Sequence, residues 1–160
     1  MIAFRPLGSA DQERLWHWLH IALWDPPPAP PRPREVLDSP GVRIYAEGWG
    51  RAGDVGVVAQ VEGLDAGACW MRLVPDAGLA YVDGRTPQLG IALEPPYQRR
   101  GYGEPLMRAA LDAARAHGFP QVSLTVHPQN PAIALYERCG FRKAGLRGTY
   151  HLMVARLESG

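Results

Sequence analysis

The sequence has no excess of charge of either sign, only two cysteines and no long apolar run. Its 160 residues carry 17 Lys and Arg against 16 Asp and Glu, which gives a formal net charge of +1. A protein so close to neutrality has no field that would hold nucleic acid or an anionic membrane without a specific site. We therefore expect neither as a partner, and any anion must bind at a local site.

The cysteines and the apolar segments exclude further classes of protein. Cys69 and Cys139 stand alone, without the CxxC spacing typical of zinc or redox sites, so we expect two reduced core thiols and no metal. Residues 1–23 are interrupted by charged side chains where a signal peptide needs an unbroken apolar stretch. No apolar run approaches the roughly 18 residues of a membrane-spanning helix. These absences predict a cytoplasmic protein.

What the sequence does have is enough apolar content for one folded domain. Hydrophobic residues make up 46% of the chain, and its length suits a single domain, residues 1–160. A chain of this size buries about 70% of the surface that its unfolded form exposes, so its core needs no metal or disulfide.

The first half predicts an edge strand, a helix and an antiparallel meander. An edge strand is expected at 2–7, and the helix after it shows an apolar stripe of helical period made by Leu15, Trp16, Leu19, Ala22 and Leu23. The proline-rich segment 26–33 predicts a stiff surface connection, followed by one helical turn at 33–39. Strands are expected at 42–46, 55–61 and 68–74, and a loop at 75–88.

The second half alternates strands with helices. The pattern predicts a strand at 89–93, a helix at 104–117, a strand at 121–126, a helix from Asn130-Pro131 to Cys139-Gly140, and a hairpin of 142–146 with 150–157. Antiparallel strands followed by a strand-helix-strand unit indicate an α+β fold whose sheet is parallel near its middle.

The most informative segment is the turn from strand 89–93 into the next helix, which reads Gln-Arg-Arg-Gly-Tyr-Gly over 98–103. Amides at a helix start have no partner within the helix and lie at the positive end of its dipole. Gly101 and Gly103 remove side chains that would keep an anion away, and Arg99 and Arg100 add local charge. The segment therefore predicts a pyrophosphate site.

Other interpretations of these glycines differ in strength. A dinucleotide-binding GxGxxG would need a third glycine where Leu106 stands, and a P-loop would need a Lys followed by Ser or Thr. An ordinary tight turn with two solvated arginines remains an alternative.

Two motifs together resemble a known family. The segment 98–103 resembles the Q/R-x-x-G-x-G/A signature of the GNAT superfamily of acetyl-CoA-dependent N-acetyltransferases, and 130–141 looks like that family's closing helix motif. The resemblance implies the GNAT fold, a mixed and partly parallel sheet of six to seven strands flanked by about four helices. It also implies that strands 89–93 and 122–126 splay apart to admit the co-substrate.

The resemblance implies where acetyl-CoA would bind. Leu93 would offer backbone groups to the pantetheine arm and polarise the acetyl carbonyl, and Glu94 and Pro95 would line the same path. The pyrophosphate would be held by Gln98, Arg99, Arg100, Gly101, Tyr102, Gly103 and Glu104. Asn130 could bind the co-substrate, although family members often place this asparagine where Gln129 stands; alternatively Asn130 caps the helix.

Tyr136 occupies the family's tyrosine position, whose phenol protonates the leaving thiolate. A thiol pKa of about 8.5 and a phenol pKa of about 10 are close enough for that transfer. The alternative is an aromatic that packs the helix onto the core. For the proton of the amine, Glu94 and His127 are both candidates, and each could equally be an ordinary turn or loop residue.

The acceptor side is the least defined. Trp18 and Trp24 fall off the apolar stripe and are candidates for the acceptor pocket, whereas Trp16 fits the core. The sequence predicts acetyl transfer to a primary amine, with a small molecule as acceptor. The alternatives are acetylation of a protein N-terminus or lysine, and a non-catalytic CoA-binding sensor or scaffold. The expected partners are acetyl-CoA and the amine, and a homodimer is allowed.

Overall fold

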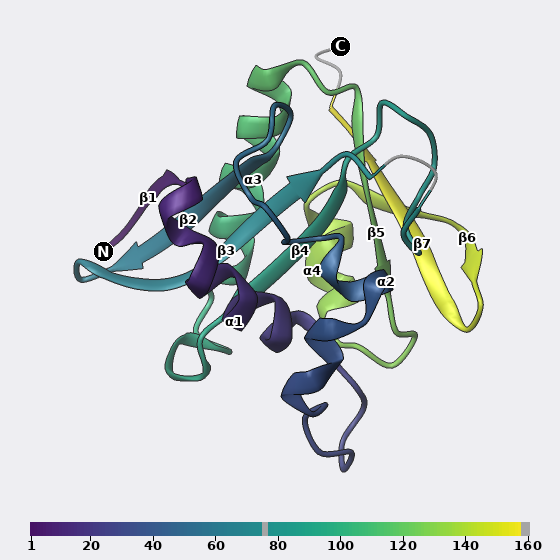
Figure 1. Cartoon of the computed structure of the whole chain (residues 1–160), viewed down its shortest axis with the longest axis horizontal. Helices are drawn as coiled ribbons and strands as arrows, with labels where there is room; N and C mark the ends of the chain where they lie inside the picture. Colours follow the sequence, from purple (N-terminus) through teal and green to yellow (C-terminus); the bar gives the residue numbers. More distant parts are fainter. Residues whose placement is uncertain (75–76, 158–160) are drawn as a thin grey trace.

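A computed structural model describes residues 1–74 and 77–157 and shows one seven-stranded sheet with helices on both faces (Figure 1). The strands are β1 (Ile2–Pro6), β2 (Val55–Val61), β3 (Leu64–Arg72), β4 (Gln88–Leu93), β5 (Gln121–Val126), β6 (Phe141–Arg147) and β7 (Tyr150–Arg156). Their order across the sheet is β1-β2-β3-β4-β5-β7-β6. Every neighbouring pair is antiparallel except β4 and β5, which confirms the mixed α+β sheet.

The helices divide between the two faces of the sheet (Figure 1). On one face lie α1 (Gln12–Ala22) and α2 (Pro40–Arg43), and on the other lie α3 (Gly103–His117) and α4 (Ala132–Arg138). Three short 3-10 turns, η1 (Ser9–Asp11), η2 (Arg34–Asp38) and η3 (Pro95–Tyr97), join these elements. Because strand side chains alternate between faces, Val57 packs in the core under α3, whereas Val58 packs under α1.

The sheet opens between β4 and β5. The only registered pair between these parallel strands, within the described residues, is Gln88 with Ser123 at the start of β4. Beyond this pair the two strands diverge, which confirms the expected separation. The divergence leaves a space at the carboxyl end of β4.

The strand expected at 42–46 is wrong. These residues continue α2 as a helical turn, with the amide of Ala46 bonded to the Arg43 carbonyl and that of Tyr45 to the Val42 carbonyl. Ser39-Pro40 is a helix start, since proline at the first helical position loses no hydrogen bond. A short apolar run does not distinguish strand from helix. The start signal favours a helix here, and contact with α1 and the sheet determines the outcome.

The expected roles of two tryptophans in α1 are also wrong. Trp18 is completely buried and Trp16 is only half-buried, with the guanidinium of Arg43 lying 5.0 Å from its ring centroid. The buried stripe runs through Leu15, Trp18 and Leu19, the i, i+3, i+4 spacing of one helix face. Trp18 is therefore core, and Trp16 lies at the edge of the stripe.

The other elements lie close to where the sequence predicts them. Strand 121–126 agrees with β5, and helix 104–117 differs from α3 by one residue. Strand 68–74 is displaced, because β3 begins at Leu64 after a tight turn at Glu62-Gly63. Two residues of the expected loop, 75 and 76, lie outside the described part of the chain.

Candidate functional site

A cavity of about 270 Å³ lies where β4 and β5 separate. Its walls come from α1, α2, the middle of the sheet and α4. The lining residues are Leu19, Ala22, Leu23, Trp24, Arg32, Gly41, Val42, Tyr45, Trp70, Leu79, Ala80, Gln88, Leu89, Gly90, Ile91, Leu124, Thr125, Val126, His127, Asn130, Tyr136 and Tyr150. The cavity therefore brings together Tyr136, His127, Asn130 and Trp24 from the sequence-predicted site.

Tyr136 of α4 contributes a phenol to this cavity. The side chain is only 8% exposed, and its ring lies edge-on to Phe141 at 6.0 Å between centroids. Its hydroxyl forms no hydrogen bond to any described residue. Burial raises the pKa of this phenol well above its ordinary value. Tyr136 thus keeps its proton at neutral pH and has a hydroxyl available to a bound molecule.

The turn from η3 into α3 presents a row of free backbone amides. The N–H groups of residues 99–104 donate to no residue of the described chain, and the first bonded amide of the helix is that of Leu106, to the Tyr102 carbonyl. Arg99 and Gly101 adopt φ values of 58° and 85°, in the left-handed region that glycine accepts without strain and that other residues rarely adopt. This arrangement can stabilise an anion.

The side chains of this turn divide into bonded and free groups. Gln98 donates its amide to the Leu93 carbonyl at 2.8 Å, and Arg100 donates to the Pro96 carbonyl at 3.0 Å. Glu104 is held on the helix surface by Arg108 and Arg138. Arg99 is exposed and has no polar partner among the described residues. Arg99 is therefore the cation most available to a phosphate.

The end of β4 directs one amide toward the space beside β5. The Glu94 amide donates to the Ala66 carbonyl of β3 at 2.8 Å. Since successive residues of an antiparallel strand direct their N–H groups to opposite sides, the Leu93 amide faces away from β3, toward the separation from β5. Pro95 follows as the first residue of η3.

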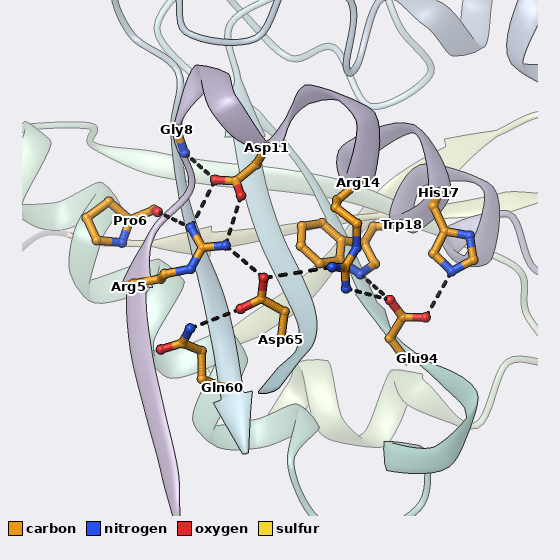
Figure 2. Close-up of polar contacts among 10 residues, drawn as sticks. All are labelled: Arg5, Pro6, Gly8, Asp11, Arg14, His17, Trp18, Gln60, Asp65 and Glu94. Atoms are coloured by element: carbon orange, nitrogen blue, oxygen red, sulfur yellow. Dashed lines mark hydrogen bonds and ion pairs between the residues drawn. The ribbon is translucent and has the colours of Figure 1, made fainter. Parts of the chain in front are cut away.

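Glu94 is not among the lining residues of the cavity, and α1 holds its carboxylate. Figure 2 shows its carboxylate accepting hydrogen bonds from Trp18 Nε1 at 3.0 Å, His17 Nε2 at 2.9 Å and Arg14 Nη2 at 3.2 Å. Burial disfavours the charged form, yet the hydrogen bonds from His17, Trp18 and Arg14 outweigh it and lower the pKa of the Glu94 carboxyl. Both carboxylate oxygens are thus occupied, which the sequence pattern at a Glu-Pro-Pro turn did not indicate.

The same network continues to the edge of the sheet (Figure 2). Arg14 lies 3.9 Å from Asp65 of β3, which also accepts hydrogen bonds from Arg5 of β1 and from Gln60 of β2. A run of alternating charges therefore ties α1 to β1, β3 and the end of β4.

His127 and Asn130 lie at the end of β5. The imidazole of His127 packs edge-on against Trp24 and Tyr150, with ring centroids 5.7 and 5.8 Å apart, and its Nδ1 accepts the Gln129 backbone N–H at 3.0 Å. The Asn130 carboxamide oxygen accepts the Ala132 amide at 2.9 Å, which is the helix-capping arrangement.

Sequence reasoning missed the wall of the cavity formed by Tyr45, Trp70, Gln88 and Gly90, which we call the deep wall. Gln88 and Trp70 are each 1% exposed, and the Tyr45 hydroxyl donates to Gln88 Oε1 at 2.7 Å. The Trp70 ring lies over Gly90, where a Cβ would come within 2.6 Å of the indole. The glycine at the centre of an apolar strand was the signal that a bulky neighbour lies close to the backbone.

The described residues form neither a membrane-spanning helix nor a metal-binding cluster. No helix within 1–74 and 77–157 has both the length and the apolar character to cross a membrane. Across the same ranges, no group of three or more His, Cys, Asp or Glu side chains could hold a metal ion.

Comparison with known proteins gives partial matches in sequence and complete matches in fold. Mycothiol acetyltransferase of Corynebacterium glutamicum (strain R) is 40% identical over 72 residues, 42% of this chain and 25% of that protein. The [ribosomal protein bS18]-alanine N-acetyltransferase of Escherichia coli (strain K12) is 40% identical over 62 residues, 38% of this chain and 42% of that protein. The matches thus span less than half the length of these curated relatives.

Two solved structures share the whole fold. The ribosomal-protein-S18-alanine N-acetyltransferase from Escherichia coli has a TM-score of 0.68 at 22% identity, and yncA from Salmonella typhimurium, solved with its cofactor acetyl-CoA, has 0.69 at 18%. Each comparison covers 100% of this chain and 96% of the other. A family model described as acetyltransferase (GNAT) family matches residues 15–141. Since this match includes the turn before α3, both diverging strands and α4, the chain belongs to the acetyltransferase (GNAT) family.

Proposed function

We propose that this protein transfers an acetyl group from acetyl-CoA to a primary amine of a small molecule, by direct attack. The observation that carries the proposal is the row of unpaired amides at 99–104, at the end of the strand that borders the cavity containing Tyr136. An anion site and a buried phenol on one path suit a molecule with a diphosphate at one end and a thioester at the other.

Acetyl-CoA would lie along the separation between β4 and β5. The amides of residues 99–104 and the Arg99 guanidinium would hold the pyrophosphate, since both offer N–H donors where negative charge is stabilised. The Leu93 amide, directed toward the same separation, would donate to the acetyl carbonyl oxygen. That amide would then stabilise the negative charge on the oxygen as the amine attacks.

The reaction needs one proton given and one taken. The amine nitrogen forms a bond to the carbonyl carbon, and the carbon–sulfur bond then breaks. Tyr136 would donate a hydrogen bond to the departing thiolate and protonate it, because its hydroxyl lines the cavity and has no partner among the described residues. The amine proton must go to a base or to water.

Of the two base candidates, the contacts favour His127. Both oxygens of Glu94 accept hydrogen bonds from α1, so we assign Glu94 a positioning role at the end of β4. His127 lies in the cavity lining, whereas Glu94 does not. Its Nδ1 carries the backbone contact to Gln129, and the amine would compete with that N–H for the ring nitrogen.

The test measures binding and turnover separately. Calorimetry with acetyl-CoA, followed by a thiol-release assay over a panel of amines, should show both binding and release. Binding without turnover on any amine or peptide would indicate a CoA-binding sensor instead. The double variant R99A/R100A should weaken CoA about tenfold more than a pantetheine fragment that lacks the diphosphate. Arg34→Ala, which removes an exposed arginine beside Trp16, is the matched control. Equal losses of affinity for CoA and for the pantetheine fragment in R99A/R100A would contradict the anion site.

A further inference from the structure

The described cavity lining contains no carboxylate. Aromatic and aliphatic side chains form most of the wall. Besides the tyrosine hydroxyls, its polar members are Arg32, Gln88, Thr125, His127 and Asn130. A wall without Asp or Glu has no group that could pair with a second positive charge on the acceptor.

Arg32, the one permanently charged side chain among the described lining residues, is already neutralised. Arg32 donates from Nε and Nη2 to the two carboxylate oxygens of Asp25, each at 2.9 Å, and Nη2 also lies 3.3 Å from the Tyr150 hydroxyl. A bidentate pair of this kind holds both charges in place. An additional ammonium group would meet the guanidinium and find the nearby carboxylate occupied.

Tyr45 and Gln88 of the deep wall are satisfied by the protein itself, whereas the indole N–H of Trp70 has no partner among the described residues. The Tyr45 hydroxyl donates to Gln88 and accepts the Leu79 amide, and Gln88 also accepts the Ala80 amide and donates to the Ala77 carbonyl. Groups that are bonded in this way offer a ligand little beyond their apolar surface. Apart from the indole N–H of Trp70, the deep wall therefore acts as an apolar surface despite containing Gln88.

The outer wall provides flat rings. Trp24 and Tyr150 both pack edge-on against His127, which leaves ring faces and edges along one side of the cavity. Aromatic groups gain most from such neighbours, because offset and edge-to-face contacts add to the burial of area. The volume of about 270 Å³ lies just below the roughly 300 to 1,000 Å³ of drug-sized ligand sites.

From these contacts, and resting on the acetyl transfer proposed above, we infer that the acceptor is a small primary monoamine whose amine is attached to an uncharged, ring-containing apolar body. Such an acceptor brings no second charge that the described lining would have to neutralise. Polyamines are disfavoured because the described lining has no carboxylate. Long peptides are disfavoured because the cavity of about 270 Å³ must also admit the thioester end of acetyl-CoA.

The first experiment compares acceptor classes with the intact protein. Thiol release is measured at saturating acetyl-CoA with tryptamine and 2-phenylethylamine, with putrescine and spermidine, and with an alanine-initiated hexapeptide. The aromatic monoamines should exceed the others in kcat/KM by about tenfold or more, as expected when one charge lacks a partner. Equal or better turnover of a polyamine or the peptide would overturn the inference.

A matched pair of variants tests the charge argument directly. Leu79 lines the cavity and is 43% exposed, so a polar replacement there leaves the buried core intact. Leu79→Asp should raise the putrescine-to-tryptamine ratio of kcat/KM about fivefold, the effect of one partly solvated ion pair. Leu79→Asn introduces a side chain of the same shape as Asp but without its charge. It should change the putrescine-to-tryptamine ratio by no more than about twofold. A ratio that moves equally in both variants would contradict the role of charge.

Failure of the inference can be told apart from failure of the proposed function. Turnover of any amine establishes acetyl transfer, whichever class is preferred. If no amine reacts, calorimetric titration of 2-phenylethylamine and putrescine into the CoA-bound protein still ranks the two. Tighter binding of the aromatic amine supports the inference, and equal or reversed affinities overturn it.

Discussion

The indole N–H of Trp18 donates to the Glu94 carboxylate across 3.0 Å, which joins the middle of α1 to the end of β4. Trp18 is completely buried, so its N–H would have no other partner available, and the carboxylate would lose one of its donors without it. The bond links a helix that borders the cavity to the strand whose Leu93 amide we assign to the acetyl group. Glu94 therefore sets the position of both walls relative to each other.

Replacing Glu94 with Gln should destabilise the protein by about 1–2 kcal/mol at pH 7, since the donors Arg14 and His17 lose a charged acceptor. The folded protein holds the Glu94 pKa below its ordinary value of 4.5, so this stabilisation is present above pH 4.5 and is lost as the pH falls through the folded value. The difference between wild type and E94Q in urea unfolding should shrink steadily from pH 5 to pH 3.

Glu13→Gln provides the control for this series. Glu13 is an exposed residue of the same helix whose side chain has no polar partner among the described residues. Its substitution should change the free energy of unfolding by less than about 0.5 kcal/mol at every pH. A Glu94 effect that persists undiminished at pH 3 would exclude the carboxylate as its source.

Tyr136→Phe should lower kcat by about 100-fold and leave the dissociation constant of CoA within about twofold. Phenylalanine keeps the packing against Phe141 and removes only the hydroxyl that would protonate the thiolate. Because burial raises the pKa of this phenol, wild-type activity should show no loss from its ionisation between pH 7 and pH 9. Tyr97→Phe, at the end of η3, is the control for removing a phenol elsewhere in the protein. An unaltered kcat in Y136F would show that Tyr136 takes no part in the reaction.

Gly101→Ala should weaken CoA binding several-fold and cost about 1 kcal/mol of stability. A Cβ at Gly101 meets no atom within 4 Å, so the cost comes only from its φ of 85°, which other residues avoid. Gly84→Ala is the matched control, since Gly84 also has open space around it and has no positive φ. Thermal unfolding and calorimetry with CoA should separate the two variants; if both behave as wild type, the shape of the turn does not matter.

Much of the second half could be predicted because its signals are local. Pro105 in a first turn, Gly118 at a helix end and the run 121–126 each act through their own backbone, and α3 and β5 lie within a residue of the prediction. The strand expected at 42–46 failed for the opposite reason. An apolar run of five residues fits either period, and contact with α1 and the sheet determines its conformation.

The candidate site divides in the same way. The turn before α3 could be predicted from adjacent glycines and arginines, because an unpaired helix start is a local property. The cavity could not, since it brings Trp24, Tyr45 and Tyr150 together from three distant segments. Glu94 shows the limit most clearly: a glutamate before two prolines suggests a solvated turn, and only tertiary contact with α1 reveals its three donors.

The close approach of Gly90 to Trp70 gives a prediction about the deep wall of the cavity. Gly90→Ala would place a Cβ 2.6 Å from the indole ring, and the ring is 1% exposed and has no room to move freely, so we expect a loss of about 1–3 kcal/mol in stability.

Trp70→Phe alone should cost less than its lost packing suggests, because the indole N–H has no hydrogen-bond partner among the described residues. In the double variant the smaller ring accommodates the new methyl group. The double variant should therefore lose less stability than the two single variants lose in sum. We expect a difference of about 1 kcal/mol or more, measured by a double-mutant cycle in urea. Strict additivity would mean that the indole does not set the requirement for glycine at this position.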